Sequence, residues 1–222
     1  MTIHHVIVFS VSAFLFLMSQ FYRFSVAVIA PRLMLDLGID TEGLSLMSAA
    51  FFYGFAFTQV PLAVFLDRIG ARKTMATLNL VGVAGAIAFA VSDSLALLTI
   101  SRLMLGIGMA SNLMGTFKLI SVWFHPGRFA TLTTMVVSLG TGGTLMATTP
   151  LALLLEAMGW RASFLLFAGI NLLLTMMLII FVRDQPPKAV HPEPLSEIPG
   201  TFRQMISGLK LLFREKDYWI IS

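Results

Sequence analysis

The sequence predicts an all-α, polytopic membrane protein with six transmembrane helices, arranged as two inverted three-helix repeats. Hydrophobic residues make up 57% of the 222 residues and charged residues only 12%, whereas a soluble domain carries roughly 25% charged residues. The apolar residues gather in six long stretches, and a segment near the second stretch recurs near the fifth. So much apolar surface needs lipid as its solvent, so the lipid bilayer is the first expected partner.

Each apolar stretch is long enough to cross the roughly 30 Å hydrocarbon core of a bilayer, which takes about 20 helical residues. The predicted spans are Ile3–Ile29, Leu44–Leu66, Thr74–Ser92, Leu95–Phe117, Phe129–Leu155 and Ala162–Val182. Backbone groups inside a bilayer find no water, so each span must form its own helical hydrogen bonds. The first stretch is longer than the roughly 7–15 apolar residues of a signal peptide and is therefore interpreted as a span.

The composition changes after Arg183, which ends a predicted six-helix bundle over residues 1–183. Asp184–Pro199 holds five of the nine prolines and is typical of an extended linker. Apolar residues then recur at helical spacing from Ile198 to Phe213, with basic residues between them, as in a helix that lies on a membrane surface. Residues 184–217 are thus expected to form a linker with an amphipathic helix, and residues 218–222 to begin a possible seventh span.

Basic residues outside the spans predict the orientation, because cytoplasmic loops carry an excess of Lys and Arg. With the amino terminus inside, the outer side carries only Arg32 and Arg161. The cytoplasmic side then carries Arg68, Arg72, Lys73, Lys118, Arg128, Arg183, Lys188, Arg203, Lys210, Arg214 and Lys216. We therefore expect a protein of the cell membrane (plasma or inner membrane) whose amino terminus and linker are cytoplasmic.

The composition also disfavours several classes of function. The net charge is +4, but the basic residues are scattered without a nucleic-acid-binding pattern, so no nucleic-acid partner is expected. The absence of cysteine excludes disulfides and thiol chemistry. The spans contain no Asp or Glu, and all four histidines lie at span ends or in loops. No metal site, cofactor or catalytic centre is therefore predicted, an intramembrane enzyme is disfavoured, and proton coupling would need residues outside these spans.

One segment of the sequence is repeated. Pro61–Arg72 reads PLAVFLDRIGAR and Pro150–Arg161 reads PLALLLEAMGWR, with Asp67 matched by Glu156. The copies are offset by 89 residues (150 − 61), and this interval contains three predicted crossings, so the copies lie on opposite faces of the membrane. The offset predicts inverted repeats over residues 1–93 and 94–183, an arrangement found in secondary transporters. Chance similarity between apolar segments is the alternative.

The loop between the second and third spans resembles a signature of the major facilitator superfamily. The loop reads Asp67-Arg68-Ile69-Gly70-Ala71-Arg72-Lys73. Arg102–Gly108 is similar to that family's fourth-span motif, Arg-x-x-x-Gly-x-Gly. Tyr53-Gly54, Gln59-Val60-Pro61 and Gly159-Trp160-Arg161 are similar to sequences of its organic-anion branches.

The resemblance implies a secondary transporter that works by alternating access and is built from two six-helix halves, of which this chain is the amino-terminal one. The second half would be a missing carboxy-terminal part or another subunit. The resemblance also implies a conformational gating loop whose aspartate contacts the other half. This loop consists of Asp67, Arg68, Gly70, Arg72 and Lys73. The chain departs from the signature at Ala63 and Phe65, where the family has glycine and leucine, and this departure concerns the packing of the second span.

Two arginines lie inside predicted spans, where a charge costs roughly 2.5–3.5 kcal/mol on insertion scales. Arg23 and Arg102 fall at similar depths, in the outer half of the membrane. The resemblance implies that the first and fourth spans line the central cavity, where the two guanidinium groups would clamp a carboxylate or phosphate. A small organic anion is therefore the favoured solute. The alternatives are that Arg23 extends its charge to the membrane surface and that Arg102 has a structural or gating role.

Polar residues near these arginines complete the predicted substrate-binding site. Ser19, Gln20 and Tyr22 lie beside Arg23 on the first span. Ser138 and Thr141 belong to a hydroxyl stripe on the fifth span. Serine and threonine in membrane helices also bond their own backbone, which is the alternative for this stripe.

Two further questions stay open in the sequence. The glycines at positions 140, 142 and 143 mark a close helix contact, which the resemblance places against the missing half, while packing inside this half is the alternative. A single half encloses no complete pathway, so a truncated or non-transporting membrane module, such as a sensor that binds solute without flux, also fits. Solute binding without flux in reconstituted vesicles would favour that module over a transporter.

Overall fold

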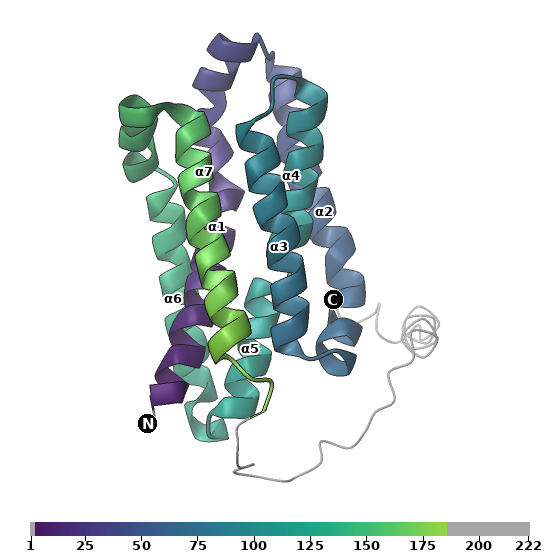
Figure 1. Cartoon of the computed structure of the whole chain (residues 1–222), viewed down its shortest axis with the longest axis vertical. Helices are drawn as coiled ribbons and strands as arrows, with labels where there is room; N and C mark the ends of the chain where they lie inside the picture. The colour runs from purple at the N-terminus through teal and green to yellow at the C-terminus, as the bar shows by residue number, and fades with distance from the viewer. Residues whose placement is uncertain (1–2, 186–222) are drawn as a thin grey trace, which may run out of the picture. The chain divides into compact units, whose positions relative to one another are not determined.

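The computed structural model describes residues 3–185, which belong to one compact unit that spans Met1–Pro186 (Figure 1). Its elements are α1 (Ile3–Leu37), α2 (Thr41–Arg68), α3 (Ala71–Ala90), α4 (Leu95–Met109), α5 (Asn112–Trp123), the 3-10 turn η1 (Pro126–Arg128), α6 (Phe129–Met146) and α7 (Thr149–Phe181). The predicted amphipathic helix and the predicted seventh span lie outside the described residues.

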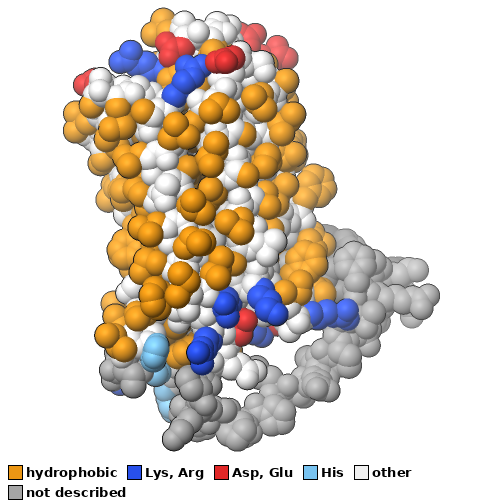
Figure 2. Space-filling model, viewed as in Figure 1, with side chains coloured by type: hydrophobic (Ala, Val, Ile, Leu, Met, Phe, Trp, Pro, Cys, Tyr) orange, Lys and Arg blue, Asp and Glu red, His pale blue; other side chains and the backbone are white. Residues whose placement is uncertain are grey.

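Six helical segments of the described part are long and apolar enough to cross a membrane, which confirms the predicted all-α, six-span fold. Charged side chains gather at the two ends of the bundle, and a broad apolar band separates them in Figure 2. The acidic end carries Asp36, Asp40, Glu42, Asp93 and Glu156. The basic end carries Arg68, Arg72, Lys73, Lys118 and Arg183. The protein is therefore an integral membrane protein.

The first helix is longer than the predicted span, which ended at Ile29. Helical hydrogen bonding continues through Pro31 to Leu37, because a proline removes only one backbone donor and does not by itself end every helix. The extension carries Asp36 to the acidic end, where its carboxylate accepts a hydrogen bond from Trp160 Nε1 at 2.9 Å. The hydropathy boundary thus marks the end of the apolar band rather than the end of the helix.

The fifth predicted span, Phe129–Leu155, is divided in the structure. Helix α6 ends at Met146 and α7 begins at Thr149, because Pro150 has no N–H with which to continue the helix. Helix α7 is itself divided in two at Gly159, whose φ of 77° and ψ of 168° are not helical. The predicted fifth span therefore corresponds to α6 with the first part of α7, and the sixth to the second part of α7.

Two glycines allow the closest helix contacts of α4. A Cβ atom on Gly106 would collide with the backbone oxygen of Phe51 in α2, and one on Gly108 would collide with the backbone of Gly82 in α3. Residues two apart on a helix lie on nearly opposite sides, since each residue turns it by about 100°. The glycines of the Arg-x-x-x-Gly-x-Gly motif thus let α2 and α3 approach opposite sides of α4, as small residues do in membrane proteins.

The glycines of α6 pack inside the described unit. A Cβ atom on Gly140 would collide with the ring of Phe16, and one on Gly143 would collide with the backbone of Leu17, both in α1. Of the two arrangements that the sequence left open, packing within this half holds for these two residues. Gly142 is more open, because the nearest atom to its would-be Cβ is Leu17 Cδ1 at 3.9 Å.

The two copies of the repeated segment end in the same backbone conformation. Gly70 has φ 97° and ψ 155°, and Gly159 has φ 77° and ψ 168°. Both conformations have a positive φ, which favours glycine because it lacks a Cβ atom. Gly70 lies between α2 and α3, beside Arg72 at the basic end, and Gly159 precedes Trp160, which bonds Asp36 at the acidic end, so the equivalent turns lie at opposite ends of the bundle.

Candidate functional site

Arg102 of α4 is buried in the middle of the bundle, with 1% of its surface exposed. Its Nη1 atom donates a hydrogen bond of 2.8 Å to the backbone oxygen of Tyr22 in α1. Its guanidinium group also lies over the ring of Phe51 in α2, 4.6 Å from the ring centre. Arg102 therefore ties α4 to α1 and α2, and its bond to α1 falls one residue before Arg23.

Arg23 lies beside this contact but is only half-buried. Its guanidinium group lies over the ring of Phe55, 4.4 Å from the ring centre. The rings of Phe51 and Phe55 are themselves stacked, 6.4 Å apart and inclined by 14°. One stack of α2 side chains thus carries both guanidinium groups, and the structure brings the two predicted arginines to one level of the bundle.

No carboxylate forms an ion pair with Arg23 or Arg102 within residues 3–185, where the two ion pairs are Lys118–Asp67 and Arg161–Asp93. The Nε atoms of both arginines are buried without a hydrogen-bond partner. Cation–π contacts contribute only about 0.5–2 kcal/mol each. The level of the bundle that holds both arginines therefore has an uncompensated positive charge, which favours an anion as its counter-charge.

The other predicted site residues of α1 point in different directions. Ser19 is buried and donates to the backbone oxygen of Met109 at 3.2 Å. Tyr22 is fully buried, with its ring against Phe164 of α7 and its hydroxyl without a partner. Gln20 is half-buried, and its Oε1 atom also lacks a partner. Of these three residues, Gln20 is most similar to Arg23, because both side chains are half-buried and each has a polar atom without a hydrogen-bond partner.

Ser138 and Thr141 are exposed on α6. The Thr141 hydroxyl donates to the backbone oxygen of Val137 at 3.3 Å, and Thr134 bonds Ala130 in the same way. These threonine hydroxyls thus bond the backbone of their own helix, which is the alternative that the sequence left open for the hydroxyl stripe. Exposed large apolar residues accompany them on α6, namely Phe129, Met135, Val137, Leu139 and Leu145. The membrane part of α7 exposes more of them, namely Leu165, Leu166, Ile170, Leu172, Leu173, Met176, Ile180 and Phe181.

A break in the fourth span gathers hydrogen-bonded polar residues, of which Asn79 and Asn112 were not among the predicted site residues. Helix α4 ends at Met109 and α5 begins at Asn112. Gln59 Nε2 donates to the backbone oxygen of Ala110 at 3.2 Å. Asn112 Nδ2 donates to the backbone oxygen of Leu15 at 3.0 Å, and Asn79 Nδ2 donates to Asn112 Oδ1 at 2.6 Å. An asparagine within an apolar span is itself a signal of such a network, because an unpaired amide is costly in lipid.

The predicted gating loop lies at the basic end. Asp67 accepts a hydrogen bond of 2.8 Å from Lys118 of α5, and both side chains are exposed to a large extent. Arg72 instead bonds the backbone oxygen of Ile179 in α7 at 2.6 Å. Sequence reasoning did not connect Lys118 with this loop, because the two ion-pair partners are 51 residues apart.

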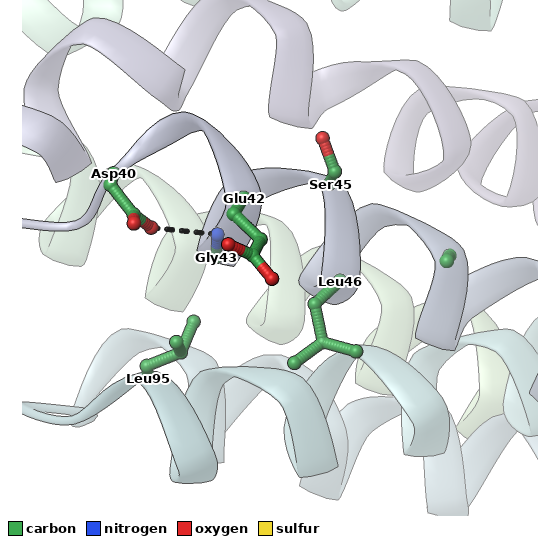
Figure 3. A pocket seen from close by; sticks show the side chains of 7 residues that line it. Asp40, Glu42, Gly43, Ser45, Leu46 and Leu95 are labelled. Carbon is green, nitrogen blue, oxygen red and sulfur yellow. Dashed lines mark hydrogen bonds between the residues drawn. The ribbon is translucent and has the colours of Figure 1, made fainter.

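A hollow of about 510 Å³ opens at the acidic end, between the start of α2 and the start of α4. It is lined by Asp40, Glu42, Gly43, Ser45, Leu46, Ala49 and Leu95 (Figure 3). Asp40 is already bonded, since its carboxylate caps α2 by accepting from Gly43 N at 2.8 Å. Leu95 precedes Arg102 by two helical turns, about 10 Å along α4. This hollow is therefore separate from the arginine level.

Comparisons with known proteins agree with this architecture. The family model described as "Major Facilitator Superfamily" matches residues 11–222. The protein named "Probable sulfoacetate transporter SauU" of Cupriavidus necator is 23% identical over 223 residues, covering 97% of this chain and 51% of that protein. The "Hexuronate transporter" of Bacillus subtilis is 25% identical over 172 residues, covering 78% of this chain and 41% of that protein. The chain thus spans about half the length of these relatives, or less.

The chain is also similar to a solved structure, that of a bacterial homologue of the human lysosomal transporter Spinster in an inward-facing and unoccupied conformation. The TM-score is 0.75 at 17% sequence identity. The match covers 93% of this chain and 49% of that one. At this identity the likeness establishes a shared fold.

Proposed function

Because this chain belongs to the Major Facilitator Superfamily, we propose that it forms the amino-terminal six-helix half of a secondary transporter for a small organic anion. Transport proceeds by alternating access, against a second six-helix half in the same protein or another subunit. The basic end faces the cytoplasm of the cell, in keeping with the excess of Lys and Arg at that end.

The observation that carries this proposal is the uncompensated positive charge of Arg23 and Arg102 within the apolar band. An intramembrane charge is costly and usually faces a cavity or a partner. The two guanidinium groups share one stack of aromatic rings, and within residues 3–185 neither is paired with an acid. The names of the relatives, which refer to sulfoacetate and hexuronate, support an organic anion as the missing counter-charge.

The two arginines have different roles in this proposal. Arg23 is half-buried and can turn its guanidinium group from Phe55 toward a solute, and the amide nitrogen of Gln20, one turn away, would be a further donor. Arg102 is buried and holds the backbone of Tyr22, so it positions α1 next to Arg23 and adds a second positive charge behind it. Ser138 and Thr141 of α6 line the polar side of the pathway, and Ser19 and Tyr22 support α1 from within the bundle.

Replacing Arg23 by glutamine tests the proposal. A charge-assisted hydrogen bond contributes about 1.5–3 kcal/mol, so Arg23→Gln is expected to weaken anion binding roughly tenfold to hundredfold. The measurement is uptake of radiolabelled sulfoacetate and glucuronate by cells that express the full gene, with membrane levels determined by immunoblot. Arg32→Gln is the matched control, because Arg32 lies on the same helix but is exposed near the acidic end. Normal insertion with unchanged uptake of every anion tested would contradict the role of Arg23.

The gating loop makes a second prediction, based on Asp67. Exposed ion pairs contribute about 0–1 kcal/mol, so neither Asp67→Asn nor Lys118→Gln is expected to lower the melting temperature by more than a few degrees. If Asp67 contacts the other half during transport, Asp67→Asn will slow uptake severalfold, while Lys118→Gln, which frees Asp67, will slow it less. Equal effects of the two variants on uptake would show that Asp67 serves only Lys118.

A further inference from the structure

We propose that Arg72 and Arg161 form a reciprocal lock, in which each arginine begins one helix and fastens the carboxy-terminal end of the other, so that α3 and the second part of α7 move as one rigid pair. The two residues occupy equivalent positions of the repeated segment, offset by 89 residues (161 − 72). The lock holds two helices of the bundle together and does not depend on which solute is transported.

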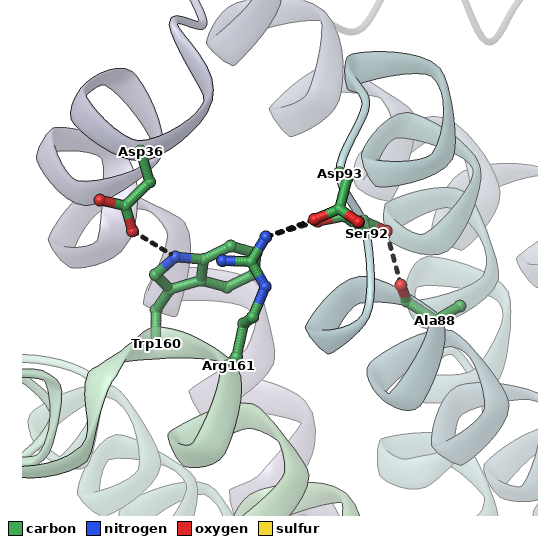
Figure 4. Close-up of polar contacts among 6 residues, drawn as sticks. All are labelled: Asp36, Ala88, Ser92, Asp93, Trp160 and Arg161. Atoms are coloured by element: carbon green, nitrogen blue, oxygen red, sulfur yellow. Dashed lines mark hydrogen bonds and ion pairs between the residues drawn. The ribbon is translucent and has the colours of Figure 1, made fainter.

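At the acidic end, Arg161 lies at the start of the second part of α7 and reaches the end of α3. Its Nη2 atom donates to the backbone oxygen of Ser92 at 3.2 Å and to the carboxylate of Asp93 at 2.6 Å. Its guanidinium group lies over the ring of Trp160, 4.2 Å from the ring centre, and Trp160 is held by Asp36. Figure 4 shows the side chains of Trp160 and Arg161 side by side, each directed at a different acid.

At the basic end, Arg72 lies in the first turn of α3 and reaches the end of α7. Its Nη2 atom donates to the backbone oxygen of Ile179 at 2.6 Å, and its backbone N–H donates to the Asp184 carboxylate at 2.7 Å. A Cβ atom on Gly70 would collide with this carboxylate. The glycine turn is therefore what lets Asp184 reach the start of α3.

In both contacts the guanidinium group of an arginine donates to a backbone oxygen near the end of a helix. Ser92 lies just after the end of α3, and Ile179 lies in the last turn of α7, where backbone oxygens lack partners within the helix. A cation at this position also complements the negative end of the helix dipole. The acids have different roles, because Asp93 pairs with the guanidinium group of Arg161, whereas Asp184 accepts from the backbone N–H of Arg72. Because α3 and the second part of α7 run antiparallel, the two contacts lie at opposite ends of the same helix pair.

Aromatic packing fills the space near one of the two contacts. The ring of Phe89 in α3 is stacked on Phe164 of α7, 4.4 Å apart, and meets Trp160 edge-on at 5.7 Å. The exposed surface of α7 is apolar, as described above, so this helix faces lipid. If α3 and the second part of α7 are fastened at both ends, they form a rigid pair on the lipid side of the bundle. Movement between helices during transport then involves the other helices of the bundle.

Hydrogen–deuterium exchange of the purified full chain in lipid nanodiscs tests the lock, because it reports each helix end separately. Arg161→Gln is expected to raise exchange at Val91 and Ser92 of the α3 end about tenfold, and to leave Val182 at the α7 end unchanged. Arg72→Gln is expected to do the opposite, raising exchange at Val182 only. Arg32→Gln at the acidic end and Arg128→Gln at the basic end are the controls, and neither should change exchange at either site.

The pattern across the two variants decides the question. A rise confined to the helix that carries the substituted arginine, or an equal rise at both ends, would overturn the reciprocal lock. Should an arginine variant not insert, Asp93→Asn and Asp184→Asn weaken the acid contacts at the same two helix ends, and the Asp93 side chain is 83% exposed, so its replacement leaves no buried charge unpaired. Each of these variants is expected to raise exchange severalfold at its own end of the pair, and unchanged exchange in both would equally overturn the lock.

Discussion

Gly106→Leu is expected to prevent the chain from reaching its folded state in the membrane. A Cβ atom at this position would collide with the backbone oxygen of Phe51 and would lie 3.0 Å from the backbone nitrogen of Phe55. Both obstacles are main-chain atoms of α2, so no side-chain rotation relieves them. Helices α2 and α4 would have to separate, which would also displace Phe51 and Phe55 from beneath the two arginines.

The measurement is the fraction of protein that elutes as a single species from size-exclusion chromatography after mild detergent extraction, together with its melting temperature. We expect little or no monodisperse Gly106→Leu protein, and a smaller loss for Gly106→Ala. Gly169→Leu is the matched control, because Gly169 is a helical glycine of α7 with no atom within 4 Å of its would-be Cβ. A folded Gly106→Leu protein with wild-type stability would show that the α2–α4 contact is not as close as the structure has it.

Arg102→Met is expected to separate stability from function. The substitution removes a charge-assisted hydrogen bond of about 1.5–3 kcal/mol and a cation–π contact of about 0.5–2 kcal/mol. It also removes the cost of a charge within the membrane, roughly 2.5–3.5 kcal/mol. These effects nearly cancel, so we expect the free energy of unfolding to change by less than about 2 kcal/mol.

Binding of an anion should respond much more strongly to the same substitution. A unit charge about 8 Å from an anion contributes roughly 2 kcal/mol at an effective dielectric constant of about 20, and the variant also releases α1 from α4 next to Arg23. We therefore expect affinity to fall by about tenfold or more in titrations of the purified chain with sulfoacetate or glucuronate. Leu105→Met, an apolar change at a buried position of the same helix, is the control. Severe destabilisation with unchanged affinity would assign Arg102 a purely structural role.

Hydropathy predicts the membrane crossings of this chain well, because each span satisfies its own backbone and needs no partner to be recognised. The ends of the helices are less predictable. Helix α1 runs on to Leu37 although apolar character falls at Pro31, since the end of the apolar band and the end of hydrogen bonding are set by different forces. Pro150 divides the fifth span at a position that a hydropathy profile does not register, whereas Gly159 lies in the predicted gap between the fifth and sixth spans.

The candidate site is predictable only in part. Arg23 and Arg102 attract attention because a charge within an apolar span is rare. Their different burial depends on contacts between distant parts of the chain, such as the bond between Arg102 and Tyr22 across 80 residues. The partnership of Lys118 with Asp67 and that of Gln59 with Ala110 each join residues 51 positions apart. The spacing of residues in the sequence does not predict such contacts, because they form only when the helices pack together.

The broken fourth span has a consequence for the order in which the chain is made. The backbone oxygens of Met109 and Ala110 are bonded by Ser19 and Gln59, which belong to α1 and α2. Asn112 is bonded by Asn79 of α3. All three partners precede the break in the sequence, so each has been synthesised before the break itself is made. The polar groups of the break can then pair on arrival, without waiting for later spans.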